Sequence, residues 1–289
     1  MKFRYLDVRR REYPVRMMCR CLQVSPSGYY AWKQRRPSRR AVANAALLER
    51  IRELHEASDG TFGAPRMWEE LAFEEIPCSR NRVARLMRRA GLQGIPIRRC
   101  RGGRRKPTRP EGIADHLRRD FGADRPNHKW VTDLTEIVTE EGKLYLGAVQ
   151  DLFSKEVVGW SMSSRQTRAL ALQAVLMALW QREDAKPVIL HSDQGSQFTS
   201  GEYQRFLIGH RVTCSMGSVG TCADNAAAES FFALLKRDRI HRRRYATRAQ
   251  ARVDVFDYIE RFHNPRMRRR LIRQARKGSG LTQLSTESG

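Results

Sequence analysis

The sequence is organised around a strand-like run with one acidic residue in its middle, Trp130-Val131-Thr132-Asp133-Leu134-Thr135. Apolar and β-branched residues dominate this run, a composition typical of a buried or half-buried strand. A lone carboxylate in such surroundings is costly unless its charge is compensated. Asp133 is therefore either a solvent-facing or arginine-paired strand residue, or a ligand of a metal ion.

Two further carboxylates follow in different settings. Asp193 ends a second strand-like run that starts at Val188, at a position where α/β proteins commonly bind ligands. Glu229 lies in the first turns of a helix expected to begin near Asp224. Taken singly, each residue has an alternative explanation. Asp193 can be an ordinary turn residue, and Glu229 can be a solvent-facing helix residue. Together, three carboxylates suit two Mg²⁺ or Mn²⁺ ions, which prefer oxygen ligands and support phosphoryl transfer.

The runs around these residues define the expected fold. Three strand-like runs are followed by alternating helical and strand-like runs, joined by short connections. Strands are expected at 130–138, 144–149, 156–161, 188–191 and 212–216, and helices at 167–182, at 201–210 and from about 224. This order predicts an α/β unit over residues 124–265 with a mixed five-stranded sheet and flanking helices, the ribonuclease H-like arrangement.

The N-terminal part of the chain is helical in pattern and basic. Residues 1–36 predict a helix-turn-helix-like segment in which Ser25 caps a helix starting at Pro26, although a generic helical hairpin explains them equally well. Residues 41–93 predict three short helices, at 41–57, 65–74 and 80–90. They form a second helix-turn-helix candidate.

The third of these helices is amphipathic and strongly basic. Val83, Leu86 and Met87 are expected to face inward. The exposed side is expected to bind DNA through five arginines, Arg80, Arg82, Arg85, Arg88 and Arg89. The alternative is a charged face that is merely solvated.

The composition points to a polyanionic partner. The chain of 289 residues holds 55 Lys and Arg against 31 Asp and Glu, a net charge of +24. Nucleic acid is the expected partner of such a surface, through phosphate neutralisation; the alternative is a basic protein whose arginine content reflects codon bias. Residues 94–123 are expected to form an extended basic linker. Residues 266–289 are expected to form a basic C-terminal tail, disordered from about residue 274.

The spacing of the cysteines and the hydropathy of the chain indicate the cellular compartment. The six cysteines form no Cys-x-x-Cys pair and no zinc-finger spacing with histidine, so we expect reduced thiols. The sequence contains no apolar run of about 18 residues and no apolar core of a signal peptide at its N-terminus. We therefore expect a cytoplasmic protein associated with DNA and not with a membrane.

The combination of motifs is more specific than its parts. Asp193 and Glu229 are separated by 35 residues, from 194 to 228. With Thr132-Asp133, the run 191–198 and the run 224–232, this spacing resembles the retroviral-integrase-like DDE transposases. It resembles more closely the second-frame (OrfB) proteins of bacterial insertion sequences of the IS-three family. The likeness extends from the N-terminal helices to about Pro265.

The resemblance implies roles for individual residues. Asp133, Asp193 and Glu229 would be the catalytic triad of an integrase core and would hold two Mg²⁺ or Mn²⁺ ions. Lys236, seven residues and about two helical turns beyond Glu229, would contact the terminal DNA. Two departures from the family pattern stand out: residue 223 is alanine where relatives have an aromatic residue, and the chain after Arg266 lacks their usual ending.

The implied activity is that of a bacterial DNA transposase. It would cleave strands at the ends of an insertion element and transfer the 3′-OH to target DNA, without a covalent enzyme intermediate. The implied partners are element-end DNA, target DNA, further copies of the chain on that DNA, and an upstream-frame protein that is fused or associated. Two alternatives are a non-catalytic DNA-binding regulator of transposition and a ribonuclease H-like nuclease or resolvase.

Overall fold

The computed structural model describes residues 2–96, 115–117, 120–182, 186–193, 196–216 and 226–286, and the side chains among them except those of 196, 226 and 277–286. The chain divides into two compact units. One comprises Met1–Leu71 and Pro77–Gly94, and the other comprises Ala72–Ile76 and Ile95–Gly289. Most of the expected basic linker, residues 97–114, lies outside the described residues.

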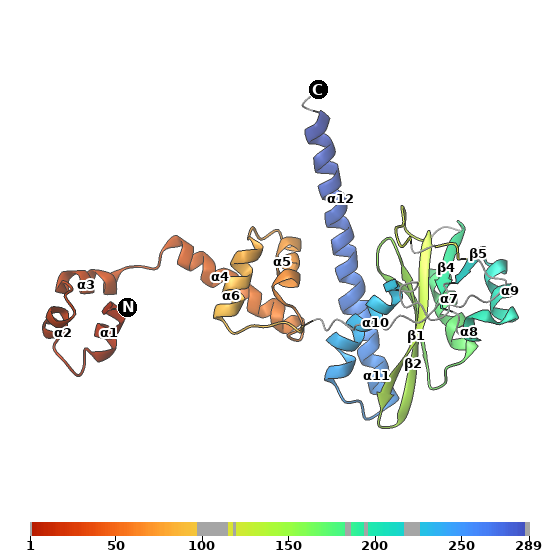
Figure 1. Cartoon of the computed structure of the whole chain (residues 1–289), viewed down its shortest axis with the longest axis horizontal. Coiled ribbons are helices and arrows are strands. Elements are labelled where there is room, and N and C mark those ends of the chain that lie inside the picture. Colours follow the sequence, from red (N-terminus) through yellow and green to blue (C-terminus); the bar gives the residue numbers. More distant parts are fainter. Residues whose placement is uncertain are drawn as a thin grey trace, which may run out of the picture. The chain divides into compact units, whose positions relative to one another are not determined.

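The first three helices lie together (Figure 1) and share a small aromatic core. They are α1 (Lys2–Arg9), α2 (Val15–Cys21) and α3 (Pro26–Gln34). As expected, Ser25 caps α3, and its Oγ accepts a hydrogen bond from the Gly28 N–H at 3.0 Å. Helix α1 was not expected, because its amphipathic pattern is weak. It is held by Leu6, which is fully buried beside Tyr29.

Helices α4 (Arg39–Ala57), α5 (Ala64–Phe73) and α6 (Arg80–Arg89) follow the predicted pattern closely. Ser79 Oγ accepts from the Arg82 N–H at 3.3 Å and caps α6. Gly91 ends this helix with a φ of +69°, a left-handed conformation that glycine adopts without strain. The inward-facing residues of α6 are buried as expected, namely Val83, Leu86 and Met87.

The second unit is built on a mixed five-stranded sheet with the strand order β3-β2-β1-β4-β5. Its strands are β1 (Lys129–Thr139), β2 (Gly142–Asp151), β3 (Val157–Ser163), β4 (Val188–Ser192) and β5 (Val212–Met216). The first three pair antiparallel, whereas β4 is parallel to both β1 and β5. The fold class predicted from the sequence is thereby confirmed.

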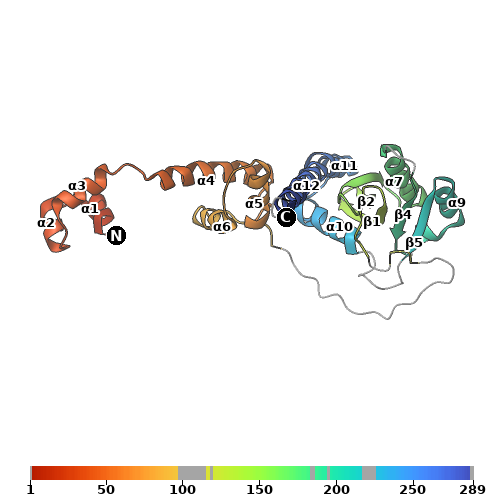
Figure 2. The same cartoon turned by 90° about the horizontal axis from the view of Figure 1, so that it is seen from above.

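Helices cover both faces of this sheet (Figure 2). Helices α7 (Arg168–Gln181), α8 (Ser196–Thr199) and α9 (Gly201–Gly209) pack on one face around Trp130 and Leu190. Helices α10 (Ala226–Asp238) and α11 (Arg248–Phe256) pack on the other, around Leu144 and Leu146. Gly159 of β3 lets α7 approach closely, because a Cβ there would lie 2.2 Å from the Ala174 carbonyl oxygen.

The chain after α10 continues as helix. A 3₁₀ helix η2 (Ile240–Arg242) precedes α11, a π-helix η3 (Asp257–His263) follows it, and α12 runs over Asn264–Thr286. The disorder expected from residue 274 is therefore wrong for the residues described. Asn264 fixes the start of α12, since its side chain both donates to and accepts from the Val157 backbone at 2.9 Å. No helix in the described ranges is long and apolar enough to cross a membrane.

Candidate active site

Asp133 lies in the middle of β1, on the face that α10 covers. Its neighbour on that face, Val131, is fully buried in a cluster with Leu117, Leu152 and Ala228. The Asp133 carboxylate is only partly exposed and accepts a hydrogen bond from the Leu134 N–H at 2.7 Å. The strand therefore holds an acidic group at the margin of an apolar cluster.

The sheet register brings Asp193 to Asp133. In the parallel pair β1–β4, Val131 is opposite His191, and each aspartate lies two residues further along its strand. A separation of two keeps a side chain on the same face, and neighbouring strands lie about 4.8 Å apart. The two carboxylates thus leave adjacent strands side by side. Asp193 is exposed, and residues 194 and 195 after it lie outside the described part.

Helix α10 supplies the third carboxylate. Ala228 is buried in the same cluster as Val131, which sets the first turn of α10 over the part of β1 that carries Asp133. Glu229 is the next residue and is exposed. Lys236 lies further along the same helix. The segment that precedes the helix, residues 217–225 with Ala223, lies outside the described residues.

The electrostatics of Asp133 report this convergence. The pKa of Asp133 is raised to about 7, chiefly by burial and in addition by the negative charges of Asp193 and Glu229. The hydrogen bond from the Leu134 N–H and the positive charge of Lys236 act in the opposite direction. Desolvation also raises the pKa of Glu229. The charges of Asp193, Glu229 and Lys236 therefore all act on the partly water-excluded Asp133 carboxylate.

The carboxylates do not close into a metal-binding set as they stand. Across the described ranges, no group of three or more His, Cys, Asp and Glu side chains is arranged to hold a metal ion. The donor chemistry nevertheless fits a hard divalent cation, because all three groups offer carboxylate oxygens and the chain places negative charge where burial penalises it. The two residues after Asp193 and the segment that precedes α10 are among those not described.

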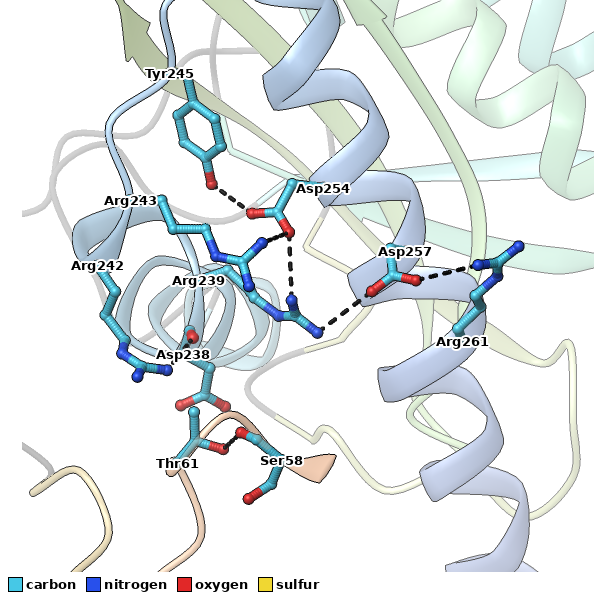
Figure 3. A network of polar contacts seen from close by, with 10 residues as sticks. All are labelled: Ser58, Thr61, Asp238, Arg239, Arg242, Arg243, Tyr245, Asp254, Asp257 and Arg261. Carbon is cyan, nitrogen blue, oxygen red and sulfur yellow. Dashed lines mark hydrogen bonds and ion pairs between the residues drawn. The ribbon is translucent and has the colours of Figure 1, made fainter. Parts of the chain in front are cut away.

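A polar network holds the C-terminal end of α10 in place (Figure 3). The sequence did not predict this network. Asp254 of α11 is buried and accepts from Tyr245 Oη at 2.6 Å and from Arg239 at 3.3 Å, and it also pairs with Arg243. Arg239 reaches Asp257 as well, at 3.3 Å. This network fixes the helix that carries Glu229 and Lys236. Arginines in a basic chain gave no local signal of such internal partners.

The five arginines proposed for DNA binding on α6 are not equivalent. Arg82 donates to Asn44 Oδ1 on α4 at 2.8 Å, and the Arg80 guanidinium lies 4.5 Å from the centre of the Trp68 ring. Both therefore help to hold the helical unit together. Arg85, Arg88 and Arg89 are exposed along the same helix. Arg80 is exposed as well, so only Arg82 of the five arginines is partly buried.

Family comparisons agree with this architecture. An integrase core domain model matches residues 123–222, a second integrase core domain model matches 229–285, and a helix-turn-helix-like domain model matches 43–100. Among solved structures, the catalytic domain of Mos1 mariner transposase is 12% identical, over 51% of this chain and 78% of that one, with a TM-score of 0.41. The HTLV-2 integrase catalytic core domain in complex with magnesium is 26% identical, over 38% and 68%, with a TM-score of 0.32.

The full-length relatives are more informative. The transposase InsF for insertion sequence IS3A of Escherichia coli (strain K12) is 39% identical over 271 residues, which cover 91% of this chain and 92% of that protein. A 31 kDa protein of insertion element IS600 from Shigella sonnei is 35% identical, over 87% and 92%. With a ribonuclease H-like integrase core and a helix-turn-helix-like unit in the same order along nearly the whole length, the chain belongs to the InsF-type DNA transposases of the IS3 family.

Proposed function

We propose that this transposase cleaves DNA at the ends of its insertion element and joins the freed 3′-OH to target DNA at the site formed by Asp133, Asp193 and Glu229. The observation that carries the proposal is the convergence of these carboxylates from β1, from the end of β4 and from α10. Phosphodiester chemistry needs charge neutralisation and alignment more than covalent help from the protein, and this arrangement supplies acidic groups for that purpose.

The three carboxylates would hold two Mg²⁺ or Mn²⁺ ions, one activating the attacking oxygen and the other stabilising the leaving oxygen. Asp133 is the most enclosed member of the set and must lose its proton before it can bind a cation. Lys236 lies within electrostatic reach of Asp133, so its ammonium group is available to hold a DNA phosphate beside the carboxylates. Water is the first nucleophile and the DNA 3′-OH the second.

Recognition of the element end is assigned to the helical units. We propose that three exposed arginines of α6, Arg85, Arg88 and Arg89, bind the DNA, while Arg82 and the likewise exposed Arg80 contribute mainly by holding the helix in place. The chain is further proposed to work as a homo-oligomer on DNA and with an upstream-frame protein, as the family resemblance implies. A regulator without catalysis, or a general nuclease, is favoured by none of these observations.

The experiment is a cleavage and joining assay on a labelled element-end duplex with target DNA and Mg²⁺ or Mn²⁺. We expect Asp193→Asn to lose at least about a hundredfold in both steps, because changes even to outer-shell partners of a metal cost about 10–100-fold. Asp124→Asn is the matched control, since Asp124 is an exposed aspartate of the same unit. If Asp193→Asn cleaves and joins as the wild type does, the proposed site is wrong.

A further inference from the structure

A tripeptide just before the catalytic core lies over the strands that carry the carboxylates. Asp115, His116 and Leu117 fall within the stretch expected to be linker, yet Leu117 is only 2% exposed. It packs with Val131, Leu152 and Ala228 in the cluster beside Asp133. This segment therefore packs beside the candidate active site.

The same tripeptide is hydrogen-bonded to the neighbouring strands. The His116 N–H donates to Ser215 Oγ at 2.9 Å, and this hydroxyl shares a second hydrogen bond of 2.9 Å with His191 Nδ1. Both Ser215 and His191 are almost completely buried. The Asp115 carboxylate is itself 10% exposed and lies 4.0 Å from His191 Nδ1. The residues that receive these contacts lie inside the protein, whereas His116 itself is exposed.

The residues that receive these contacts form one row across the sheet. Val131 of β1 is opposite His191 of β4, and His191 is opposite Ser215 of β5. Paired residues of parallel strands point to the same face, so the tripeptide runs along this row on the face of α10. Leu117 covers the β1 end of the row, and Asp115 and His116 reach the β4 and β5 end.

Each contacted residue is a close neighbour of a catalytic carboxylate in the chain. Val131 precedes Asp133 by two positions, and His191 precedes Asp193 by two. Ala228, which also packs on Leu117, directly precedes Glu229. A single short segment thus contacts the supports of all three carboxylates, which come from three separate elements.

We propose that Asp115–Leu117 is a positioning segment of the active site, which holds β1, β4 and α10 so that Asp133, Asp193 and Glu229 meet. This inference rests on the proposed function. None of the three residues is required to touch DNA or metal. Their effect is exerted through packing and hydrogen bonds on the backbone beside the carboxylates, as outer-shell groups orient the ligands of metal sites.

The test compares variants of the full chain by Mn²⁺ titration in a calorimeter and by cleavage kinetics. Leu117→Ala removes the packing, and Ser215→Ala removes the hydrogen bonds with little change in volume. The matched controls are Leu207→Ala and Ser161→Ala. Leu207 is a fully buried leucine on the opposite face, and the Ser161 hydroxyl donates to the Leu170 carbonyl at 2.6 Å. Thermal unfolding shows which variants are folded at the assay temperature.

We expect Leu117→Ala and Ser215→Ala to bind Mn²⁺ about tenfold more weakly and to lower kcat with little change in KM for DNA. Leu117→Met and Ser215→Thr should restore most of both. The two controls should bind Mn²⁺ as the wild type does. The inference is overturned if Leu117→Ala and Ser215→Ala bind Mn²⁺ no differently from Leu207→Ala and Ser161→Ala.

Failure of this inference differs from failure of the proposed function. In the first case, Asp193→Asn abolishes cleavage while the positioning variants match their controls. In the second, Asp193→Asn itself binds Mn²⁺ and cleaves as the wild type does. In that case the carboxylates are not the metal site, and their positioning segment is rejected together with them.

Discussion

The carboxylate site and the basic face of α6 are both charged, but the protein treats the two charges in opposite ways. Asp133 is held in a partly water-excluded region among like charges, where its pKa is raised to about 7. Arg85, Arg88 and Arg89 are exposed to water on the helical unit. The charge proposed to perform the chemistry is concentrated by burial and depends on geometry. The charge proposed to bind DNA phosphate is distributed and screened by salt, so each residue is expected to contribute a small share.

The largest effect should come from removing the buried charge. Asp133→Asn should reduce cleavage by at least about a hundredfold, since a ligand is lost. The metal-free variant should nevertheless melt at a higher temperature than the wild type at pH 8, because a penalised buried charge is also lost. Cleavage and thermal denaturation measure the two effects. Glu140→Gln, which changes an exposed hairpin residue, should alter neither; an unchanged cleavage rate in Asp133→Asn contradicts the assignment.

The next largest effect should come from disrupting the polar network around Asp254, which supports α10. Asp254→Ala leaves Arg239 without its buried partner and should cost about 3 kcal/mol of the free energy of unfolding. Tyr245→Phe removes only the hydroxyl that donates to Asp254 and should cost about 1 kcal/mol. Urea denaturation measures both. If both variants lose the same free energy of unfolding, the ion pairs of Asp254 contribute no more than its hydrogen bond from Tyr245. That result would contradict the prediction.

Metal binding at the carboxylates should depend on pH, because Asp133 holds a proton up to about pH 7. The folded protein holds a proton on Asp133 up to about pH 7, against an ordinary value of 3.8, so it binds more protons than the unfolded chain between these values. Metal-free stability should therefore fall as pH rises from about 4 to about 7. Apparent Mn²⁺ affinity should rise over pH 5–7, by up to about tenfold per pH unit, and then level off. Calorimetric titration at several pH values tests this; a flat profile below pH 7 contradicts it.

The smallest effects should come from the exposed arginines. Changing Arg88 and Arg89 together to alanine should weaken DNA binding at every ionic strength. It should also lower the slope of log affinity against log salt by about 2, without changing stability. Arg82→Ala should instead cost about 1 kcal/mol of stability through the lost bond to Asn44. Fluorescence anisotropy at several salt concentrations and urea denaturation distinguish the two. If Arg82→Ala alone lowers the salt slope, the division of roles on α6 is wrong.

Deleting residues 1–112 extends the comparison to the whole helical part. We expect the remaining core to lose its preference for element-end DNA while keeping metal-dependent nicking of any duplex. Competition between end and random duplexes measures that preference. If the truncated chain keeps the preference, recognition lies in the second unit.

Much of the fold follows from local pattern. The β-branched run around Asp133, the Ser25 cap and the inward face of α6 are each specified within a few neighbouring residues, and the structure confirms them. Helix α1 and the helices after α10 were missed because their stabilising contacts come from distant parts of the chain. Leu6 is buried against Tyr29, and Asn264 is bonded to Val157. Leu117 likewise shows no helical or strand pattern, and only its partners reveal that it belongs to the core.

The sequence by itself determined the identity of the acidic residues, the type of element that carries each, and the excess of positive charge that binds DNA. Only the tertiary structure decided that Val131 is opposite His191 and that Ala228 packs on the same face, which brings Asp133, Asp193 and Glu229 together. Propensity and capping act over a few residues, whereas strand register and helix packing are set by contacts between residues far apart in the chain. The same distinction applies to charge. The number of arginines can be read from the sequence, but only the packing distinguishes the arginines that stabilise the protein from those proposed to bind DNA.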